Sequence, residues 1–345
     1  MASLKEKFAS KIPVWGEEIK KILKEKGDVK ISDVTVQQAF GGMRGVKGMI
    51  CDTSLVEPDK GLIIRGTPIL ELTDKLPEEI FFLLLSGDLP NDQEVKDLQA
   101  EYKKRGEVPG YVWDVLKAMP KTSHPMAMFD TAVLVMENES IFRKKYAEGI
   151  PKGQYWDAVY EDGMNLLAKL PAIGAGVYRI KYDKGDLIDP DPKLSWGANF
   201  AHMMGIDDET FYKAMELYFT LHCDHEGGNV SAFSCHTIAS ALSDPYYSVS
   251  GGLNGLAGPL HGLANQECLK WVLEMMDKLG GGTPSKDQIK DYAWETLNSG
   301  KVIPGYGHAV LRVTDPRFTA FLNFGREHLP DSPVLTTVSR VYEVV

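Results

Sequence analysis

The chain has 345 residues, of which 43% are hydrophobic and 25% are charged, values typical of a soluble globular protein. This length accommodates two domains, and the longest apolar run of the N-terminal half, IFFLLL (80–85), is too short to span a bilayer. The formal net charge of −10 argues against nucleic acid or anionic membrane as partners, so an anionic ligand requires a local concentration of positive charge.

The first 27 residues, rich in Lys and Glu, predict one or two amphipathic helices that end at Gly27. Neither a secretory signal nor an Arg/Ser-rich transit peptide is visible there. Residues 29–66 contain short β-prone runs such as GLIIRG (61–66). The segment GGMRGVKG (41–48) matches no phosphate-loop pattern, and a glycine-rich β-hairpin is the better interpretation. Helical periodicity dominates the rest, which predicts a mainly α protein with a small β element near the N-terminus.

The segment FYKAMELYFTLHCDHEGG (211–228) predicts a helix that ends at Gly227 and carries His222 and His225 on its apolar stripe. Asn229 is placed to cap the next helix. A histidine on such a stripe is more often a core residue than a ligand contact. The neighbouring cysteines and histidines lack the C-x-x-C or H-E-x-x-H spacing of a zinc site, so no metal is expected. Four cysteines without regular spacing indicate a reduced intracellular compartment.

The glycine-rich segment GGLNGLAGPLHG (251–262) suggests a domain boundary, with a large helical domain over 1–261 and a small domain over 262–345. His261 lies at or just before the start of a helix whose apolar face includes Leu269, Val272 and Met276. The positive end of that helix disfavours imidazolium, and a neutral imidazole can donate a hydrogen bond to a developing enolate oxygen. The alternative is that His261 only caps the helix or packs locally.

The segment KVIPGYGHAVLRVTDPR (301–317) lies between two helices, the first opened by the capping pair Ser285 and Gln288 and the second by Pro316. Its glycines expose backbone groups to a flat heterocycle or an anion, beside His308. Arg312 and Arg317 add positive charge, and Arg317 is placed where its guanidinium and the helix N–H groups face one carboxylate. A tight turn with an incidental histidine is the alternative.

Four segments in order, GGMRGVKG, HCDHEGGNVSA, NGLAGPLHGLANQE and LNSGKVIPGYGHAVLRVTDPR, resemble citrate synthases, most of all the eukaryotic mitochondrial type. The resemblance runs from about Leu4 to the end of the chain. It implies an almost entirely α-helical homodimer of two-domain subunits in the mitochondrial matrix. The implied reaction condenses acetyl-CoA with oxaloacetate and hydrolyses citryl-CoA to citrate and CoA, with no metal or redox cofactor.

The resemblance also implies roles for individual residues. His261 hydrogen-bonds the thioester carbonyl, and His308 polarises and protonates the oxaloacetate carbonyl. His225 and Arg317 bind oxaloacetate. CoA is bound by the backbone loop, by Arg312 and by a lysine that stands where arginine is expected; these CoA-binding residues are Val302, Ile303, Pro304, Gly305, Tyr306, Gly307, Arg312 and Lys152.

One departure is large, because the family's catalytic aspartate lies beyond Val345 and Asp331 falls too early to replace it. The resemblance is therefore to a C-terminally shortened citrate synthase whose small domain is incomplete. Little condensation is expected from the 345-residue chain alone. The alternatives are a 2-methylcitrate synthase that uses propionyl-CoA, a non-catalytic relative that keeps the binding site, and a zinc hydrolase.

Overall fold

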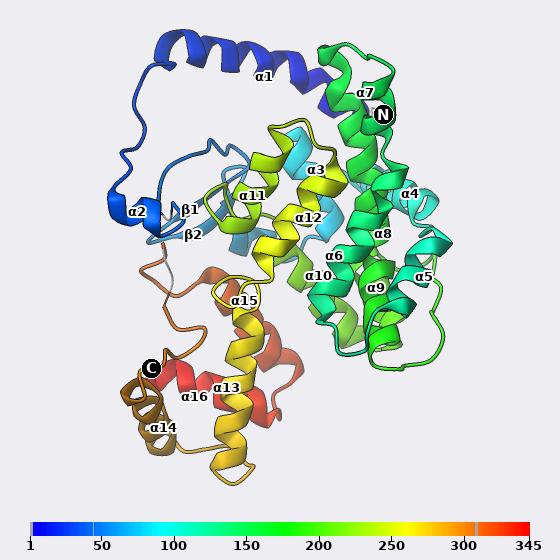
Figure 1. The fold of residues 1–345 in the computed structure, drawn as a ribbon. Coiled ribbons are helices and arrows are strands. Elements are labelled where there is room, and N and C mark those ends of the chain that lie inside the picture. Colours follow the sequence, from blue (N-terminus) through cyan, green and yellow to red (C-terminus); the bar gives the residue numbers. More distant parts are fainter. Residues whose placement is uncertain (1–2, 44, 308–309) are drawn as a thin grey trace. The chain divides into compact units, whose positions relative to one another are not determined.

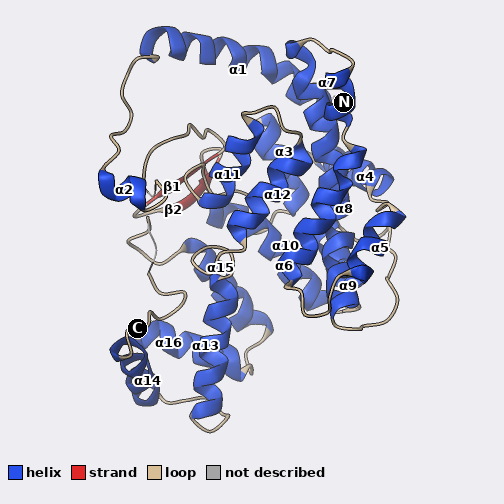
Figure 2. Cartoon of the chain, in the orientation of Figure 1, coloured by secondary structure: helices blue, strands red, loops and turns tan. Residues whose placement is uncertain are grey.

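The computed structural model describes residues 3–43, 45–307 and 310–345, and these residues form a mainly helical protein with one small sheet (Figure 2). The sheet has three strands in the order β1 (Ser54–Glu57), β2 (Gly61–Ile64) and β3 (Thr67–Pro68). The predicted fold class is confirmed, and GLIIRG contains β2 as expected. No helix in the described part of the chain has the length and apolar character of a membrane span.

The N-terminal helix α1 (Leu4–Lys26) ends at Gly27, as predicted, and begins with a capping box formed by Ser3 and Glu6. The predicted hairpin at 41–48 is wrong, because none of the described residues in that range belongs to a strand. The short helix α2 (Val36–Phe40) precedes them instead. Its capping box, formed by Thr35 and Gln38, stabilises a helical turn where β structure was expected.

Ten α-helices follow the sheet region up to residue 256. They are α3 (Pro77–Ser86), α4 (Asp92–Arg105), α5 (Gly110–Ala118), α6 (Pro125–Val135), α7 (Ile141–Ala147), α8 (Tyr155–Lys181), α9 (Trp196–Met204), α10 (Glu209–Leu221), α11 (Val230–Ala239) and α12 (Pro245–Leu256). The long helix α8 packs against α4, α6, α7 and α9 (Figure 1). Its buried face meets apolar side chains such as Val112, Leu116 and Tyr246, and this cluster forms one of the hydrophobic cores.

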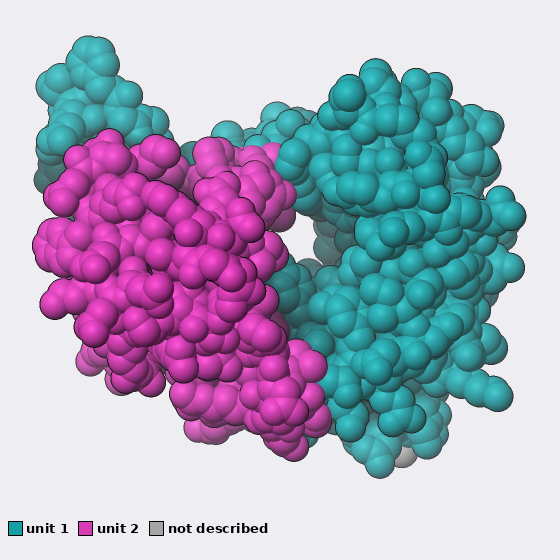
Figure 3. Space-filling view, turned by 90° about the horizontal axis from the view of Figure 1, so that it is seen from below, with its two compact units in different colours: residues 1–55, 64–66, 74–254 teal, residues 56–63, 67–73, 255–345 magenta. Residues whose placement is uncertain are grey.

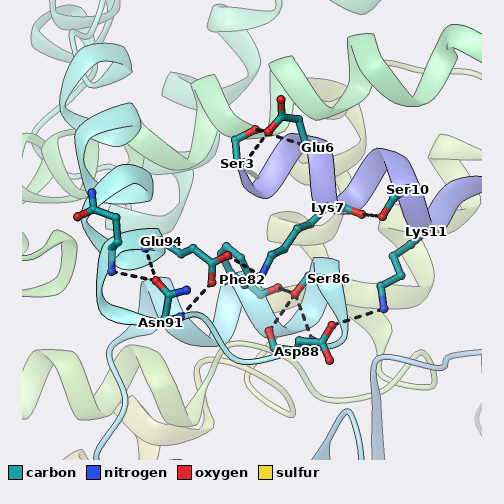
Figure 4. Close-up of polar contacts among 11 residues, drawn as sticks. Ser3, Glu6, Lys7, Ser10, Lys11, Phe82, Ser86, Asp88, Asn91 and Glu94 are labelled. Carbon is teal, nitrogen blue, oxygen red and sulfur yellow. Dashed lines mark hydrogen bonds and ion pairs between the residues drawn. The ribbon is translucent and has the colours of Figure 1, made fainter. Parts of the chain in front are cut away.

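A partly buried ion pair is among the contacts that hold helix α1 on α3 and α4 (Figure 4). Lys7 Nζ lies 2.5 Å from Glu94 Oε1 and 5.0 Å from the centre of the Phe82 ring. Glu94 is only 5% exposed. Burial by itself would raise the pKa of this carboxyl, but Lys7 and the Asn91 backbone N–H lower it below its ordinary value. Glu94 therefore stays ionised and holds the first half of α1.

The remaining helices are α13 (Ala264–Lys278), α14 (Lys286–Asn298), α15 (Pro316–His328) and α16 (Pro333–Val344). Helix α16 packs against the other three around a core that includes Trp271, Met275 and Val341. The capping box of Ser285 and Gln288 is confirmed. The predicted apolar face of α13 is partly wrong, because Val272 and Met276 are buried but Leu269 is 50% exposed. Trp271 and Met275 occupy the buried positions instead.

The chain divides into two compact units, coloured separately in Figure 3. Unit 1 contains residues 1–55, 64–66 and 74–254, and unit 2 contains residues 56–63, 67–73 and 255–345, including the 3-10 helix η1 (Ile69–Leu72). Two short segments near the sheet thus group with the C-terminal helices. The domain boundaries drawn from the sequence, 1–261 and 262–345, stay a prediction.

Candidate active site

His225 lies in the loop between α10 and α11, which corrects the prediction that it belongs to the helix before it. Helix α10 ends at Leu221. The chain then turns, and Glu226 adopts a left-handed conformation with a φ of +47°. Side chains supply the hydrogen bonds of this turn: Asp224 Oδ1 accepts the backbone N–H of His225 at 2.9 Å. Such local side-chain bonds compete with helical backbone bonds, so the helix stops before the predicted glycines.

The carbonyl side of His225 is also fixed. Asn229 Nδ2 donates to the backbone oxygens of His225 at 2.9 Å and of Glu226 at 3.0 Å. The other end of the same amide, Asn229 Oδ1, accepts from the Ala232 N–H and caps α11, which confirms the predicted cap. The backbone of the half-buried His225 is therefore held on both sides by side chains of its own loop.

His261 lies in a tight turn that leads into α13. Its backbone N–H donates to the Gly258 oxygen at 3.0 Å, and its own carbonyl accepts from the Ala264 N–H at 3.1 Å. Because Ala264 is the first residue of α13, the predicted position just before a helix is confirmed. Burial lowers the pKa of His261 below its ordinary value. Burial, and not the helix dipole expected from the sequence, favours the neutral imidazole of His261.

The segment from Val302 to Gly307 is a surface loop anchored by two side chains. Ile303 is 6% exposed, and Ile303 and Tyr306 pack into the core of unit 2. Burial also raises the pKa of Tyr306 well above its ordinary value. Between them, Pro304 and Gly305 form a turn, while Val302, Gly305 and Gly307 are exposed. The two anchors leave the backbone of both glycines at the surface.

Gly305 fits this loop for two separate reasons. Its φ is +83°, a conformation that residues with a Cβ adopt at a cost. A Cβ at this position would lie 2.8 Å from Cys268 Sγ, a thiol of α13. His308, which follows Gly307, lies outside the described residues.

Arg312 is exposed and its guanidinium bends back toward its own loop. Nη1 donates to the carbonyls of Val310 at 3.0 Å and Leu311 at 2.8 Å. The backbone N–H of Arg312 donates to the Pro58 oxygen at 2.7 Å, which ties this loop to the turn between β1 and β2.

Arg317 is the second residue of α15, and it is paired with a carboxylate of the chain itself. Asp315 Oδ1 accepts the Arg317 backbone N–H at 2.9 Å and the guanidinium Nε at 3.0 Å. Asp315 Oδ2 accepts from Nη2 at 2.6 Å. One carboxylate was expected to accept from both the helix N–H and the Arg317 guanidinium. In the structure this carboxylate is the Asp315 side chain. Asp315 was not among the predicted site residues, although an acidic residue directly before a helix-starting proline is a typical N-cap.

Lys152 begins the 3-10 helix η3 (Lys152–Gln154) and is exposed. The predicted residues are shared between the compact units. Unit 1 contains His225 and Lys152, and unit 2 contains His261, the loop 302–307, Arg312 and Arg317. Among the residues that the structure describes, no three or more His, Cys, Asp or Glu side chains are grouped as metal ligands.

Two of these features bear on chemistry. Burial favours the neutral form of the His261 imidazole just before α13, and Arg317 carries its guanidinium at the start of α15. The class of enzyme to which the chain belongs, a condensing acyltransferase, is shown by its relatives.

Comparison with known proteins gives the family. The family model for the C-terminal domain of citrate synthase matches residues 42–345. The chain is 47% identical to the mitochondrial citrate synthase of Saccharomyces cerevisiae, over 99% of this chain and 73% of the relative. It is also 47% identical to the mitochondrial 2-methylcitrate synthase of Yarrowia lipolytica, over 99% of this chain and 76% of the relative. The crystal structure of citrate synthase from Pyrobaculum aerophilum has a TM-score of 0.78 and 29% identity, covering 88% of this chain and 75% of that one. The chain belongs to the citrate synthase family.

Proposed function

We propose that this protein condenses the acetyl group of acetyl-CoA with oxaloacetate and hydrolyses the resulting citryl-CoA to citrate and CoA. The proposal is supported chiefly by the 47% identity to a citrate synthase along nearly the whole chain. It is also supported by His261, which lies just before α13 and whose pKa is lowered by burial. The chemistry requires loss of a proton from a thioester methyl group, which is possible only when the enolate oxygen is stabilised.

The roles of the two histidines follow from that requirement. Neutral His261 donates a hydrogen bond to the thioester oxygen as negative charge develops on that oxygen. A neutral imidazole can stabilise the developing enolate without carrying a positive charge itself. The methyl C–H bond breaks, and the new C–C bond forms at the keto carbon of oxaloacetate. His308 gives its proton to the keto oxygen, which becomes the hydroxyl of the product. A general base takes the methyl proton, and the electron pair of the broken C–H bond becomes the new C–C bond.

Binding of oxaloacetate is assigned to His225 and Arg317. Because the Arg317 guanidinium already forms a fork with Asp315, a substrate carboxylate has to share or replace that partner. The preformed pair orients the guanidinium before the substrate arrives. CoA binding is assigned to the backbone of 302–307, which receives the adenine, and to Arg312 and Lys152, which contact phosphates.

A second substrate is supported by the relative from Yarrowia lipolytica, which is a 2-methylcitrate synthase at the same 47% identity. Propionyl-CoA differs from acetyl-CoA by one methylene, which an apolar pocket discriminates by only about 1–3 kcal/mol. Measurement of kcat/KM for both thioesters with the full gene product separates the two functions. A higher value for acetyl-CoA supports citrate synthesis, and a higher value for propionyl-CoA overturns it.

The remaining properties are proposed with the function. The reaction uses no metal or redox cofactor, since hydrogen bonds and proton transfers suffice for it; activity that disappears with a chelator and returns with a metal ion would contradict this. The protein acts in the mitochondrial matrix, supported by the mitochondrial relatives, and does not bind nucleic acid or membranes. It forms a homodimer, which sedimentation equilibrium tests directly.

Substrate binding can be tested apart from catalysis. Isothermal titration of oxaloacetate into the protein is expected to give one saturable site whose affinity falls at least tenfold in His225→Ala and in Arg317→Gln, since each loses a hydrogen bond to a charged group. Absence of oxaloacetate binding by the unaltered protein would overturn the proposed function.

A further inference from the structure

The loop that contains His225 is attached to a segment far away in the sequence. Thr53 Oγ1 donates to Asp224 Oδ2 at 2.6 Å, across 171 residues of chain. The other oxygen of that carboxylate accepts the backbone N–H of His225 at 2.9 Å. One carboxylate therefore joins the hydroxyl of Thr53 to the backbone of His225. An O–H to carboxylate bond of this length belongs to the strong, charge-assisted class.

Thr53 is itself fixed to the core of unit 1. Its carbonyl accepts the Arg65 backbone N–H at 2.8 Å. The Arg65 side chain, only 14% exposed, donates from Nε and Nη2 to the Leu84 carbonyl in α3 at 3.0 and 2.6 Å. A continuous set of hydrogen bonds thus runs from α3 through Arg65, Thr53 and Asp224 to His225. All of these residues belong to unit 1.

A second set of contacts lies beside the first. The Glu226 N–H donates to Ser54 Oγ at 2.6 Å, and Ser54 is 6% exposed. Gly227 packs so closely on the same segment that a Cβ there would lie 3.1 Å from Met49 Sδ. Cys51 Sγ lies 3.3 Å from Thr53 Oγ1. The segment from Met49 to Ser54 therefore packs against the loop that contains His225.

We infer that Thr53 and Asp224 are positioning residues for oxaloacetate binding, acting through His225. This inference rests on the proposed role of His225. Both carboxylate oxygens of Asp224 accept hydrogen bonds within unit 1, one from the His225 backbone N–H and one from the Thr53 hydroxyl, so this carboxylate fixes the His225 backbone. A side chain mounted on a fixed backbone loses less conformational freedom on binding, which strengthens binding without an added contact.

The test compares three threonine variants by isothermal titration of oxaloacetate and by thermal unfolding. Thr53→Val keeps the shape of the side chain and removes the hydroxyl donor, and it is expected to weaken oxaloacetate binding about tenfold. Thr53→Ser restores the donor and is expected to bind within about twofold of the unaltered protein. Thr131→Val is the matched control, since it removes a hydroxyl whose bond to the Ala127 carbonyl stays within α6. It is expected to leave binding unchanged.

A double variant decides whether the effect passes through His225. In the His225→Ala background, Thr53→Val is expected to cause no further loss of affinity, because coupled residues are not additive. CoA binding is expected to be the same in all variants. Equal oxaloacetate affinity in Thr53→Val and the unaltered protein, or a tenfold loss that persists in the His225→Ala background, would overturn the inference. If the unaltered protein binds no oxaloacetate, the proposed function fails instead.

Discussion

Replacement of Gly305 by alanine tests how the CoA loop is built. Two costs add at this position. The φ of +83° is unfavourable for a residue with a Cβ, by about 1–2 kcal/mol. The new Cβ would also lie 2.8 Å from Cys268 Sγ and 3.2 Å from Cys268 Cβ, so the packing must shift, at about 1–3 kcal/mol. We therefore expect Gly305→Ala to lower the free energy of unfolding by about 2–5 kcal/mol and to weaken CoA binding.

Two controls separate these costs. Gly307 also has a positive φ, of +100°, but its Cβ position has no heavy atom within 4 Å. Gly307→Ala should therefore show the backbone cost alone. The Cys268→Ala background removes the Sγ contact and keeps the residue-268 Cβ at 3.2 Å, so most of the packing cost of Gly305→Ala should disappear there, with a coupling energy of up to about 1–3 kcal/mol. The assay is urea unfolding, with CoA titration in parallel. Equal losses for Gly305→Ala and Gly307→Ala, or additive effects with Cys268→Ala, would refute this account of the loop.

Three further predictions concern charged groups. Lys7→Met leaves Glu94 without its ammonium partner and is expected to cost about 1–3 kcal/mol of unfolding free energy at pH 7. The pKa of Glu94 is lowered in the folded state, so the stabilisation by its charge is present above the ordinary glutamate pKa and is lost as pH falls through the folded pKa. The loss of unfolding free energy in Lys7→Met, measured by urea titration, should therefore shrink in acid. A loss that stays constant with pH would contradict the ion pair. NMR titration of the His261 ring should give a pKa below the ordinary histidine value. Acidification should destabilise the fold, because the unfolded state binds that proton more readily. A pKa at or above the ordinary value would exclude His261 as a neutral hydrogen-bond donor. Arg317→Lys retains charge without the planar fork and should weaken oxaloacetate binding about tenfold with little change in CoA affinity, whereas equal affinity would remove Arg317 from the binding site.

Local signals in the sequence predict local structure well in this chain. The end of α1 at Gly27, the capping box of α14 and the start of α15 at Pro316 each depend on residues within one turn of the boundary. The same holds for His261, whose place before α13 follows from the proline and glycines around it. The capping box of α2, T-x-x-Q, was available in the sequence but was outweighed by the β-prone residues nearby.

Features that depend on distant residues were not predicted. Helix α10 ends early where Asp224 meets Thr53, and no pattern near residue 224 indicates a partner 171 residues away. The close packing of Gly305 on Cys268 and the exposure of Leu269 likewise follow from tertiary packing, which overrides helical periodicity. The internal pair of Asp315 and Arg317 is local, but its geometry requires a folded helix start.

The most direct test of the proposed reaction is steady-state citrate formation from acetyl-CoA and oxaloacetate by the full gene product, compared with His261→Ala and His308→Ala. Each histidine is assigned to charge that develops only during reaction, so kcat should fall at least about a hundredfold in each variant. KM for oxaloacetate should change little in His261→Ala. A kcat in either variant within a few-fold of the unaltered protein would contradict the assignment of that histidine to the chemistry.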